Sequence, residues 1–296
     1  MKPALLKLHA AVFLWGFTGV LGRLIHLNEG LLVWYRLSIT IITLFLLMWK
    51  QQKLEKPPVK TVAKLFAVGC IVALHWVFFY GSIKAANVSI ALTCLSSAGL
   101  FTALIEPFIT KTPINITEIA LGLLGVLGIC LIFHFDARFH SGILIGVVAT
   151  ILSVLFSIFN KKLVRTIKPK TMMLYELIGG WLMCTLLLPF YLTVFPTTYL
   201  FPSLTDVIWL VLLSWFCTVL AMELSLQALK KVSVFTQNLS LNLEPVYGIG
   251  LAFIIYHEEK GLSDSFYIGF GLIILSVGLQ MLRTVFIKSQ VIGSQQ

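Results

Sequence analysis

The sequence predicts an all-α membrane protein with ten transmembrane helices, arranged as two inverted five-helix repeats. Three observations support this fold class: an apolar composition, ten separate apolar runs and a one-sided distribution of basic residues. The 296 residues are 58% hydrophobic and only 11% charged, whereas soluble domains carry about 25% charged residues. A soluble core cannot hide this much apolar surface, so we expect lipid to surround most of the chain.

Each apolar run has about the 20 residues that one helix needs to cross a bilayer. The runs cover residues 4–24, 30–49, 63–83, 87–109, 116–134, 141–160, 172–194, 205–227, 232–256 and 265–287. The short gaps leave no room for a soluble domain of about 50 residues or more. A transmembrane barrel would show alternating polarity, but Ile41–Met48 and Ile119–Phe133 are apolar almost throughout.

The first run is predicted to be a retained helix and not a cleaved signal peptide. It contains Trp15 and continues to Leu21 without a small-residue cleavage pattern. All five cysteines fall inside predicted helices and form no CxxC motif, so we read them as small apolar residues. We expect no disulfide, no metal site and no cofactor.

The lysines and arginines lie mostly on one side of the membrane. If the loops alternate between the two sides, 17 of the 22 basic residues share the side of the N-terminus, four lie opposite, and Arg36 lies within the second run. Positive charge marks the cytoplasmic side, so both termini are predicted to be cytoplasmic, in the plasma (inner) membrane. This topology accounts for the net charge of +10 without a nucleic-acid partner; anionic lipid would add some attraction.

The two halves of the sequence resemble each other. Residues 82–88 align with 228–234, residues 20–24 align with 159–163, and Tyr35 aligns with Tyr175. Five helices per half, in residues 1–137 and 138–296, would place the second half upside down in the membrane. Inverted repeats are a recurrent plan of secondary transporters, with one central site between the repeats. A chance match between apolar sequences is the alternative.

Several short motifs resemble the drug/metabolite transporter superfamily, EamA type. They are Trp15-Gly16, Arg36, the segment Leu243-Glu-Pro-Val246, Tyr256-His-Glu258 and the glycine-rich segment from Ile268 to Gly278. The resemblance covers essentially the whole chain. The first half departs from the pattern, because Gly99 stands opposite Pro245 and no glutamate follows the fourth helix. The resemblance implies transport of small solutes without ATP, often export of amino acids or related metabolites.

Glu244 is the strongest candidate for a functional residue. It lies near the middle of the ninth run, where a charge costs at least about 2.5–3.5 kcal/mol on insertion scales. Gln237, Ser240 and Tyr247 are predicted to share its helix face, and Pro245 is expected to kink the helix. Two interpretations stay open: a carboxylate that binds a substrate amine or carries a proton, and a structural carboxylate bonded within the bundle.

Other polar positions also have two interpretations. Asn238 and Asn242 point away from Glu244, so only one of the two faces is expected to line a cavity. Ser89, Thr93 and Ser96 form a stripe that allows either close helix packing or a polar cavity wall. His75 could carry protons or be satisfied by a neighbouring helix, and Trp76 and Tyr80 could stack on a ring or cation, although Tyr80 also suits an interfacial aromatic belt.

The resemblance implies a central cavity lined by the first, third, fourth, sixth, eighth and ninth helices. The candidate residues on those helices are Trp15, His75, Trp76, Ser96, Ser157, Met222, Glu223, Asn242, Glu244 and Tyr247. In the eighth run, Trp215, Thr218 and Met222 are expected to share a face. Arg36 is interpreted as a structural residue that snorkels outward, and Glu106, Glu118 and Glu176 are expected at the membrane interface.

The function predicted from these residues is secondary transport of a small metabolite by alternating access, with an amphipathic zwitterion such as an amino acid as substrate. Glu244, Glu223 and His75 could in addition bind protons. An enzyme or a channel is the alternative, but the sequence contains no HExxH motif and no pore-filter motif, and without a P-loop an ATP-driven pump would need a partner subunit. The sequence does not indicate an oligomeric state.

Overall fold

The computed structural model describes residues 2–86, 88–133, 140–244, 246–247 and 264–293, and these residues are helical apart from short connections and turns. The helices are α1 (Lys2–Leu24), α2 (Glu29–Lys50), α3 (Val59–Ala85), α4 (Val88–Ser96), α5 (Ala98–Thr110), α6 (Ile116–Phe133), α7 (His140–Leu163), α8 (Pro169–Val194), α9 (Leu204–Ser214), the π-helix η2 (Trp215–Leu220), α10 (Ala221–Leu229), α11 (Val234–Ser240) and α13 (Asp264–Gly293). No strand occurs in this part of the chain.

Among the described residues, seven helical segments are long and apolar enough to cross a membrane. They are Lys2–Leu24, Glu29–Lys50, Val59–Ala85, Ile90–Thr110, His140–Leu163, Pro169–Val194 and Leu204–Leu229, and Ile116–Gly128 and Tyr267–Arg283 are shorter apolar helices. The sequence-based prediction of an all-helical membrane protein is therefore confirmed. The predicted ninth helix, 232–256, runs into residues that lie outside the described part of the chain.

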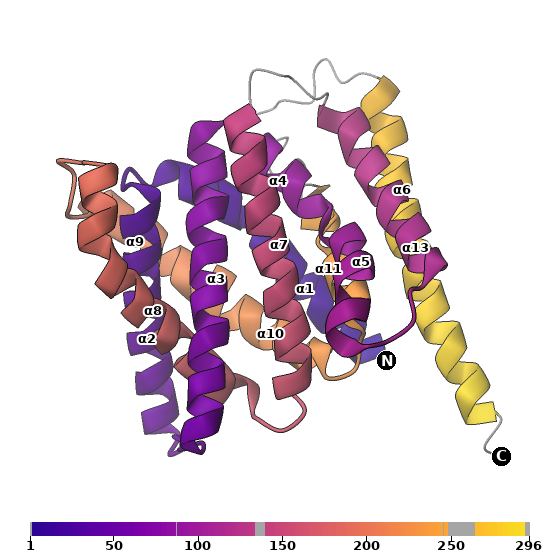
Figure 1. The fold of residues 1–296 in the computed structure, drawn as a ribbon, viewed down its shortest axis with the longest axis horizontal. Helices are drawn as coiled ribbons and strands as arrows, with labels where there is room; N and C mark the ends of the chain where they lie inside the picture. The colour runs from indigo at the N-terminus through magenta and orange to yellow at the C-terminus, as the bar shows by residue number, and fades with distance from the viewer. Residues whose placement is uncertain (1, 87, 134–139, 245, 248–263, 294–296) are drawn as a thin grey trace.

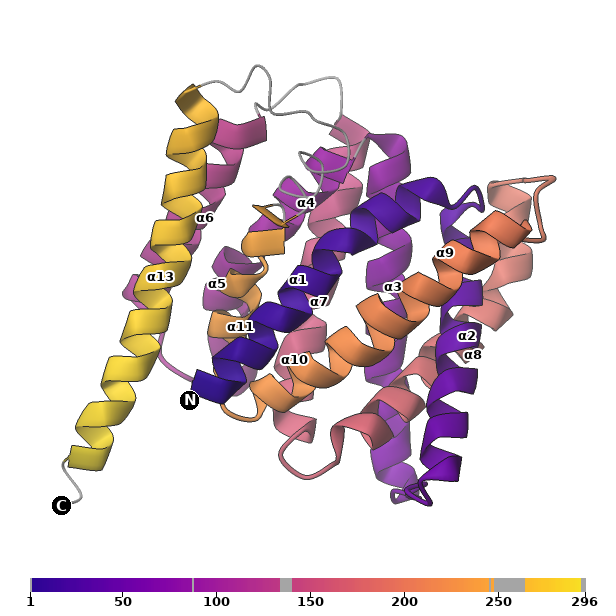
Figure 2. The same ribbon diagram turned by 180° about the vertical axis from the view of Figure 1, so that it is seen from behind.

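The helices form a bundle with α3 at its centre, packed against α7 and α8 (Figure 1). On the opposite side of the bundle α1 lies beside α10, while α6 and α13 form a pair at one edge (Figure 2). Large apolar side chains cover the outside: Leu186 is 80% exposed, Phe108 76% and Phe190 71%. Because a water-soluble surface would not present such residues in continuous helices, the outer surface is suited to lipid.

Polar side chains define where several helices begin. Asn28 caps α2 by accepting a hydrogen bond from the Leu31 amide at 2.9 Å, and Ser233 caps α11 by accepting one from the Thr236 amide at 3.0 Å. Pro169 stands in the first turn of α8, where its missing N–H costs nothing. These caps satisfy backbone donors that would otherwise be unpaired at the helix ends.

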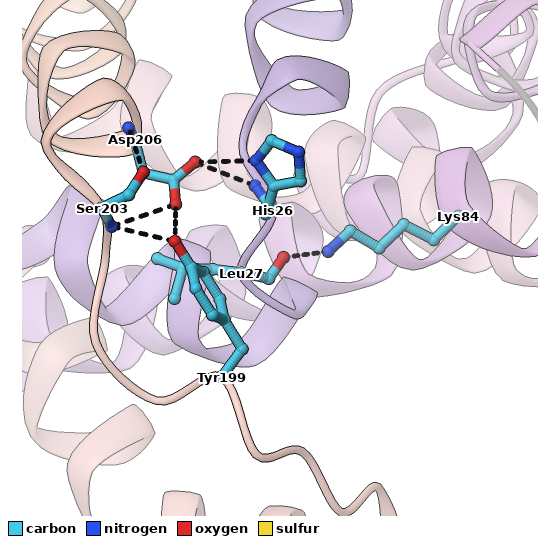
Figure 3. Close-up of polar contacts among 6 residues, drawn as sticks. All are labelled: His26, Leu27, Lys84, Tyr199, Ser203 and Asp206. Atoms are coloured by element: carbon cyan, nitrogen blue, oxygen red, sulfur yellow. Dashed lines mark hydrogen bonds and ion pairs between the residues drawn. The ribbon is translucent and has the colours of Figure 1, made fainter.

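Asp206 joins two connections at one end of the bundle (Figure 3). It forms a capping box with Ser203 at the start of α9. Its carboxylate also accepts hydrogen bonds from the His26 backbone amide at 3.0 Å and the Tyr199 hydroxyl at 2.5 Å. The His26 ring is 3.3 Å away but 77% exposed, so its ion pair adds little stability. The backbone and hydroxyl bonds therefore hold the α1–α2 turn against α9.

A second carboxylate joins two connections at the other end of the bundle. Glu55, between α2 and α3, accepts hydrogen bonds from Lys168 and from the Thr171 hydroxyl, and its backbone carbonyl accepts one from Tyr175 at 3.1 Å. The bond from Lys168, followed by that from Thr171, holds the pKa of this carboxyl below its ordinary value. The carboxylate is therefore charged at neutral pH and ties the α2–α3 connection to the start of α8.

The π-helix changes which residues face inward in the eighth run. In η2 the Thr218 hydroxyl donates to the Leu213 carbonyl, five residues earlier, at 3.0 Å. The wider turn shifts the helical register, so Trp215 is 48% exposed while Thr218 and Met222 are buried. The prediction that these three residues share a face was wrong for Trp215, because it assumed 3.6 residues per turn throughout.

Candidate functional site

A cavity lies inside the helix bundle. Side chains from α1, α2, α3, α4, α7, η2, α10 and α11, together with Leu241 and Glu244, form its wall. The helices of both sequence halves therefore contribute to it. Ligand sites are typically concave and mostly apolar, with a few polar groups that orient the ligand, and this wall combines apolar rings with a small number of polar side chains.

Arg36 supplies a buried positive charge to the cavity wall. It is 1% exposed, so the expectation that it snorkels outward was wrong. Its Nε donates to the Thr218 hydroxyl and its guanidinium NH1 to the Tyr80 hydroxyl, both at 2.9 Å. The guanidinium carbon lies 3.9 Å from the centre of the Trp76 ring, a cation–π contact that stabilises a desolvated charge. Tyr80 is fully buried and not part of an interfacial belt.

The side chains of Glu244, Asn238 and Gln237 lie on the same wall. Glu244 lines the cavity and is 3% exposed. The Asn238 amide donates to the Thr102 hydroxyl at 2.8 Å, and its carbonyl accepts from Ser157 at 3.0 Å. Gln237 also lines the cavity, and its carbonyl oxygen has no partner among the described residues. The wall therefore offers both a cation and unused acceptors to a ligand.

His75 and Trp15 are anchored while they line the cavity. The His75 Nδ1 lies 2.8 Å from the Ala149 carbonyl of α7, so this nitrogen carries a hydrogen and donates it. The Trp15 indole N–H donates to the Cys217 carbonyl at 3.0 Å, which fixes its ring against η2. These bonds hold two flat rings in defined positions on the wall, where they can contact the apolar part of a ligand.

The structure brings six of the ten predicted site residues to the cavity and leaves four outside it. Those on the wall are Trp15, His75, Trp76, Ser157, Met222 and Glu244. Ser96 donates to the Leu92 carbonyl of its own helix, and Glu223 accepts from Gln227 and pairs with Lys170 at 3.6 Å. Neither one contributes a side chain to the cavity wall.

Asn242 and Tyr247 also lie outside the cavity, although Gln237 and Glu244 line it. Asn242 points at α6, where a side chain on Gly125 would collide with its amide, and Tyr247 packs edge-on against Phe13 at 5.4 Å. The backbone gives the reason, because the amides of residues 241, 242 and 244 each bond to the carbonyl three residues earlier. This tighter winding changes the direction of the following side chains. Pro245 lies outside the described residues.

Several cavity residues were missed by sequence reasoning. Ser153, Phe156 and Asn160 of α7 line the cavity with the predicted Ser157. A signal was present, because Ser153, Ser157 and Asn160 are spaced by four and three residues and so follow one helix face. The polar stripe on the sixth predicted helix could therefore have been recognised. The side chains of Ser89 and Thr93 lie outside the described part of the chain.

The acidic residues predicted at the interface behave differently from one another. Glu118 is partly exposed and pairs with Arg283 at 3.6 Å, and Glu106 is partly buried. Glu176, in contrast, is 0% exposed. The prediction of an interfacial position was wrong for Glu176, because Gly69 lets α3 approach the α8 backbone at this residue and cover it.

Comparison with known proteins identifies the family to which this chain belongs. The sequence pattern described as "EamA-like transporter family" matches this chain twice, over residues 2–134 and 140–282. The chain belongs to the EamA-like transporter family. A solved structure described as "Crystal structure of protein" superposes with a TM-score of 0.76 and 15% sequence identity, covering 96% of this chain and 98% of that chain; this likeness concerns the fold. A search of the curated proteins gives no match.

As an EamA-like transporter, the chain is a multi-pass membrane protein of the drug/metabolite transporter superfamily and transports small molecules. Its family consists of transporters and not of enzymes. Among the described residues, no group of three or more His, Cys, Asp or Glu side chains is placed to hold a metal ion.

Proposed function

We propose that this chain is a secondary transporter that moves a small metabolite across the plasma membrane by alternating access, as an exporter of amino acids or related compounds. The observation that carries the proposal is the cavity, which holds a buried guanidinium and a buried carboxyl between helices of both halves. Residues 1–137 and 138–296 form two inverted repeats of five spans each in this proposal. Both termini lie in the cytoplasm.

The chemistry of the wall supports a zwitterionic substrate. Arg36 attracts a carboxylate, and Glu244 attracts an ammonium group, so the two ends of an amino acid find opposite charges. Trp15, Phe79 and Phe156 provide apolar surface for a side chain. Some residues predicted to bind substrate lie outside the wall, such as Glu223 and Asn242. In this proposal they contribute to packing and do not contact the substrate.

Neutralising Glu244 is expected to weaken substrate binding. Glu244→Gln keeps the size of the side chain and removes its charge, so the Michaelis constant for the substrate is expected to rise about tenfold or more, as for loss of a hydrogen bond to a charged group. The measurement is uptake of a radiolabelled amino-acid panel into proteoliposomes, with and without a pH gradient. The matched control is Glu118→Gln, which neutralises a glutamate that is paired with Arg283 away from the cavity.

Saturable uptake by the native protein and by Glu118→Gln, with a raised Michaelis constant in Glu244→Gln, would support the proposed site. Equal Michaelis constants in all three proteins would show that Glu244 has a structural role and does not bind substrate. If native protein that is shown to be folded transports no member of the panel, the amino-acid substrate class is wrong and other metabolites must be tested.

A further inference from the structure

A second buried carboxyl lies beside the cavity, and its polar atoms are unused. Glu176 of α8 is 0% exposed, and so is Asn160 of α7. The Asn160 amide lies next to the Glu176 carboxyl, yet all four polar side-chain atoms of this pair lack a completed hydrogen bond to any described residue. Asn160 also forms part of the cavity wall, so the pair connects the carboxyl to the cavity.

Charged groups near this pair are engaged elsewhere. Charged and titratable groups on the surrounding helices include Arg36 of α2, Lys64, Cys70 and His75 of α3, Lys161 of α7, Lys170 and Tyr175 of α8, and Glu223 of α10. The His75 ring is bonded to the Ala149 carbonyl, and the Tyr175 hydroxyl to the Glu55 carbonyl. Lys170 pairs with Glu223, Lys161 donates to the Leu229 carbonyl at 2.6 Å, and Lys64 is exposed. Arg36 and Cys70 have the partners Tyr80 and the Gly179 carbonyl. Glu176 therefore has no counter-ion among the described residues.

A carboxyl in this environment is stable only in its neutral form. A buried ion without a partner pays the full cost of leaving water, and proteins avoid this cost by binding or releasing a proton. As an acid, Glu176 has both a donor and an acceptor to offer to Asn160, whose amide likewise carries a donor and an acceptor. As an anion, it requires water or a cation, which this closed packing excludes. The charge of Glu176 is thus linked to whether water reaches this end of the cavity.

The position of Glu176 mirrors that of Arg36. Arg36 is the eighth residue of α2 (Glu29–Lys50), and Glu176 is the eighth residue of α8 (Pro169–Val194). The two helices begin at opposite ends of the bundle (Figure 2). Both residues are buried two turns into their helices, but Arg36 has three partners, whereas Glu176 has Asn160 beside it and no completed hydrogen bond to a described residue. One end of the cavity therefore has a permanently charged cation, and the other has a carboxyl free to gain and lose a proton.

We propose that Glu176 and Asn160 form a proton-binding site that couples transport to protons. When an end of the cavity opens and admits water, the carboxylate is hydrated and a proton from that side can bind to it. The end closes around the neutral acid, as in this structure, and the proton returns to water when the site is hydrated from the other side. Each cycle then carries one proton, and Glu176 alternates between carboxylate and acid. The coupling part of this inference rests on the proposed transport function.

The protonation of Glu176 can be measured without transport. Infrared difference spectra between native protein and Glu176→Gln, which mimics the neutral acid, are expected to contain a carboxylic-acid carbonyl band at neutral pH. Asn160→Leu is expected to move this band, because it removes the neighbouring amide. Absence of the band from the native-minus-Glu176→Gln spectrum would overturn the proposal. Glu118→Gln is the matched control and is expected to give no such band, since that carboxylate is paired and partly exposed.

The coupling is tested by comparing two transport modes. Counterflow at equal pH requires no net proton movement, so gradient-driven uptake by each protein is expressed relative to its own counterflow. In Glu176→Gln this ratio is expected to lose its dependence on the pH gradient. Stimulation equal to native in Glu176→Gln would contradict the coupling. If native protein shows no counterflow of any substrate, the proposed function fails, but the infrared band still decides whether Glu176 binds a proton.

Discussion

Replacing Gly69 with alanine is expected to disrupt the packing of α3 on α8 and to lower the free energy of unfolding by about 1–3 kcal/mol. A Cβ atom at Gly69 would lie 1.7 Å from the Glu176 carbonyl oxygen. Gly179 is equally constrained, because its Cβ would lie 2.4 Å from the Phe66 Cα. Both collisions involve backbone atoms, which cannot rotate away, so the two helices must separate.

The measurement is the unfolding transition of purified protein in detergent, followed by tryptophan fluorescence. Gly271→Ala is the matched control, since no described atom lies within 4 Å of a Cβ at that position of α13. Alanine should be neutral there or stabilise the helix by about 0.5–1 kcal/mol, because it replaces a flexible glycine. If Gly69→Ala and Gly271→Ala unfold alike, the close approach of α3 and α8 is wrong.

Replacing Arg36 with methionine is expected to reduce transport about tenfold to a hundredfold. The substitution keeps an unbranched side chain but removes the charge, and charge-assisted hydrogen bonds contribute about 1.5–3 kcal/mol. Arg36→Lys is expected to fall between native and Arg36→Met. Lysine keeps the charge, but its ammonium cannot reproduce the flat guanidinium that stacks on Trp76 while bonding Thr218 and Tyr80.

Tyr80→Phe is the matched control for Arg36, since it removes one hydrogen bond and leaves both the ring and the charge. We expect it to retain most of the transport activity. The measurement is the initial rate and Michaelis constant of uptake at equal amounts of folded protein. A native Michaelis constant and rate in Arg36→Met would show that the guanidinium takes no part in substrate binding.

The helices could be predicted well from apolar runs, because lipid requires continuous apolar segments in which each backbone group is bonded. Capping residues such as Asn28 and Ser203 follow from local chemistry, and they stand where α2 and α9 begin. The depth of Arg36 in its helix was also visible, whereas Glu176 was expected at the interface. Their burial was not visible, because depth along one helix says nothing about which neighbouring helix covers the side chain.

Departures from regular winding explain the site residues that were assigned to the wrong face. The prediction for Asn242 and Tyr247 assumed one regular helix from Gln237 onward, but the chain tightens between Ser240 and Glu244. The wide turn of η2 has the same effect on Trp215. Such changes in winding arise from packing between helices far apart in the sequence, and no local sequence motif predicts them. Glu244 and Ser157 line the cavity, and their role in binding stays a prediction.

The most direct test of the account is whether the substrate occupies the cavity. Ser153 lines the cavity, so Ser153→Cys, in a chain whose five native cysteines are replaced by alanine, places a single thiol on its wall. Substrate that the protein transports is expected to slow the labelling of this thiol by N-ethylmaleimide, while labelling of Lys53→Cys, exposed between α2 and α3, stays unchanged. Equal labelling of Ser153→Cys with and without saturating substrate would contradict the assignment of this cavity as the substrate site.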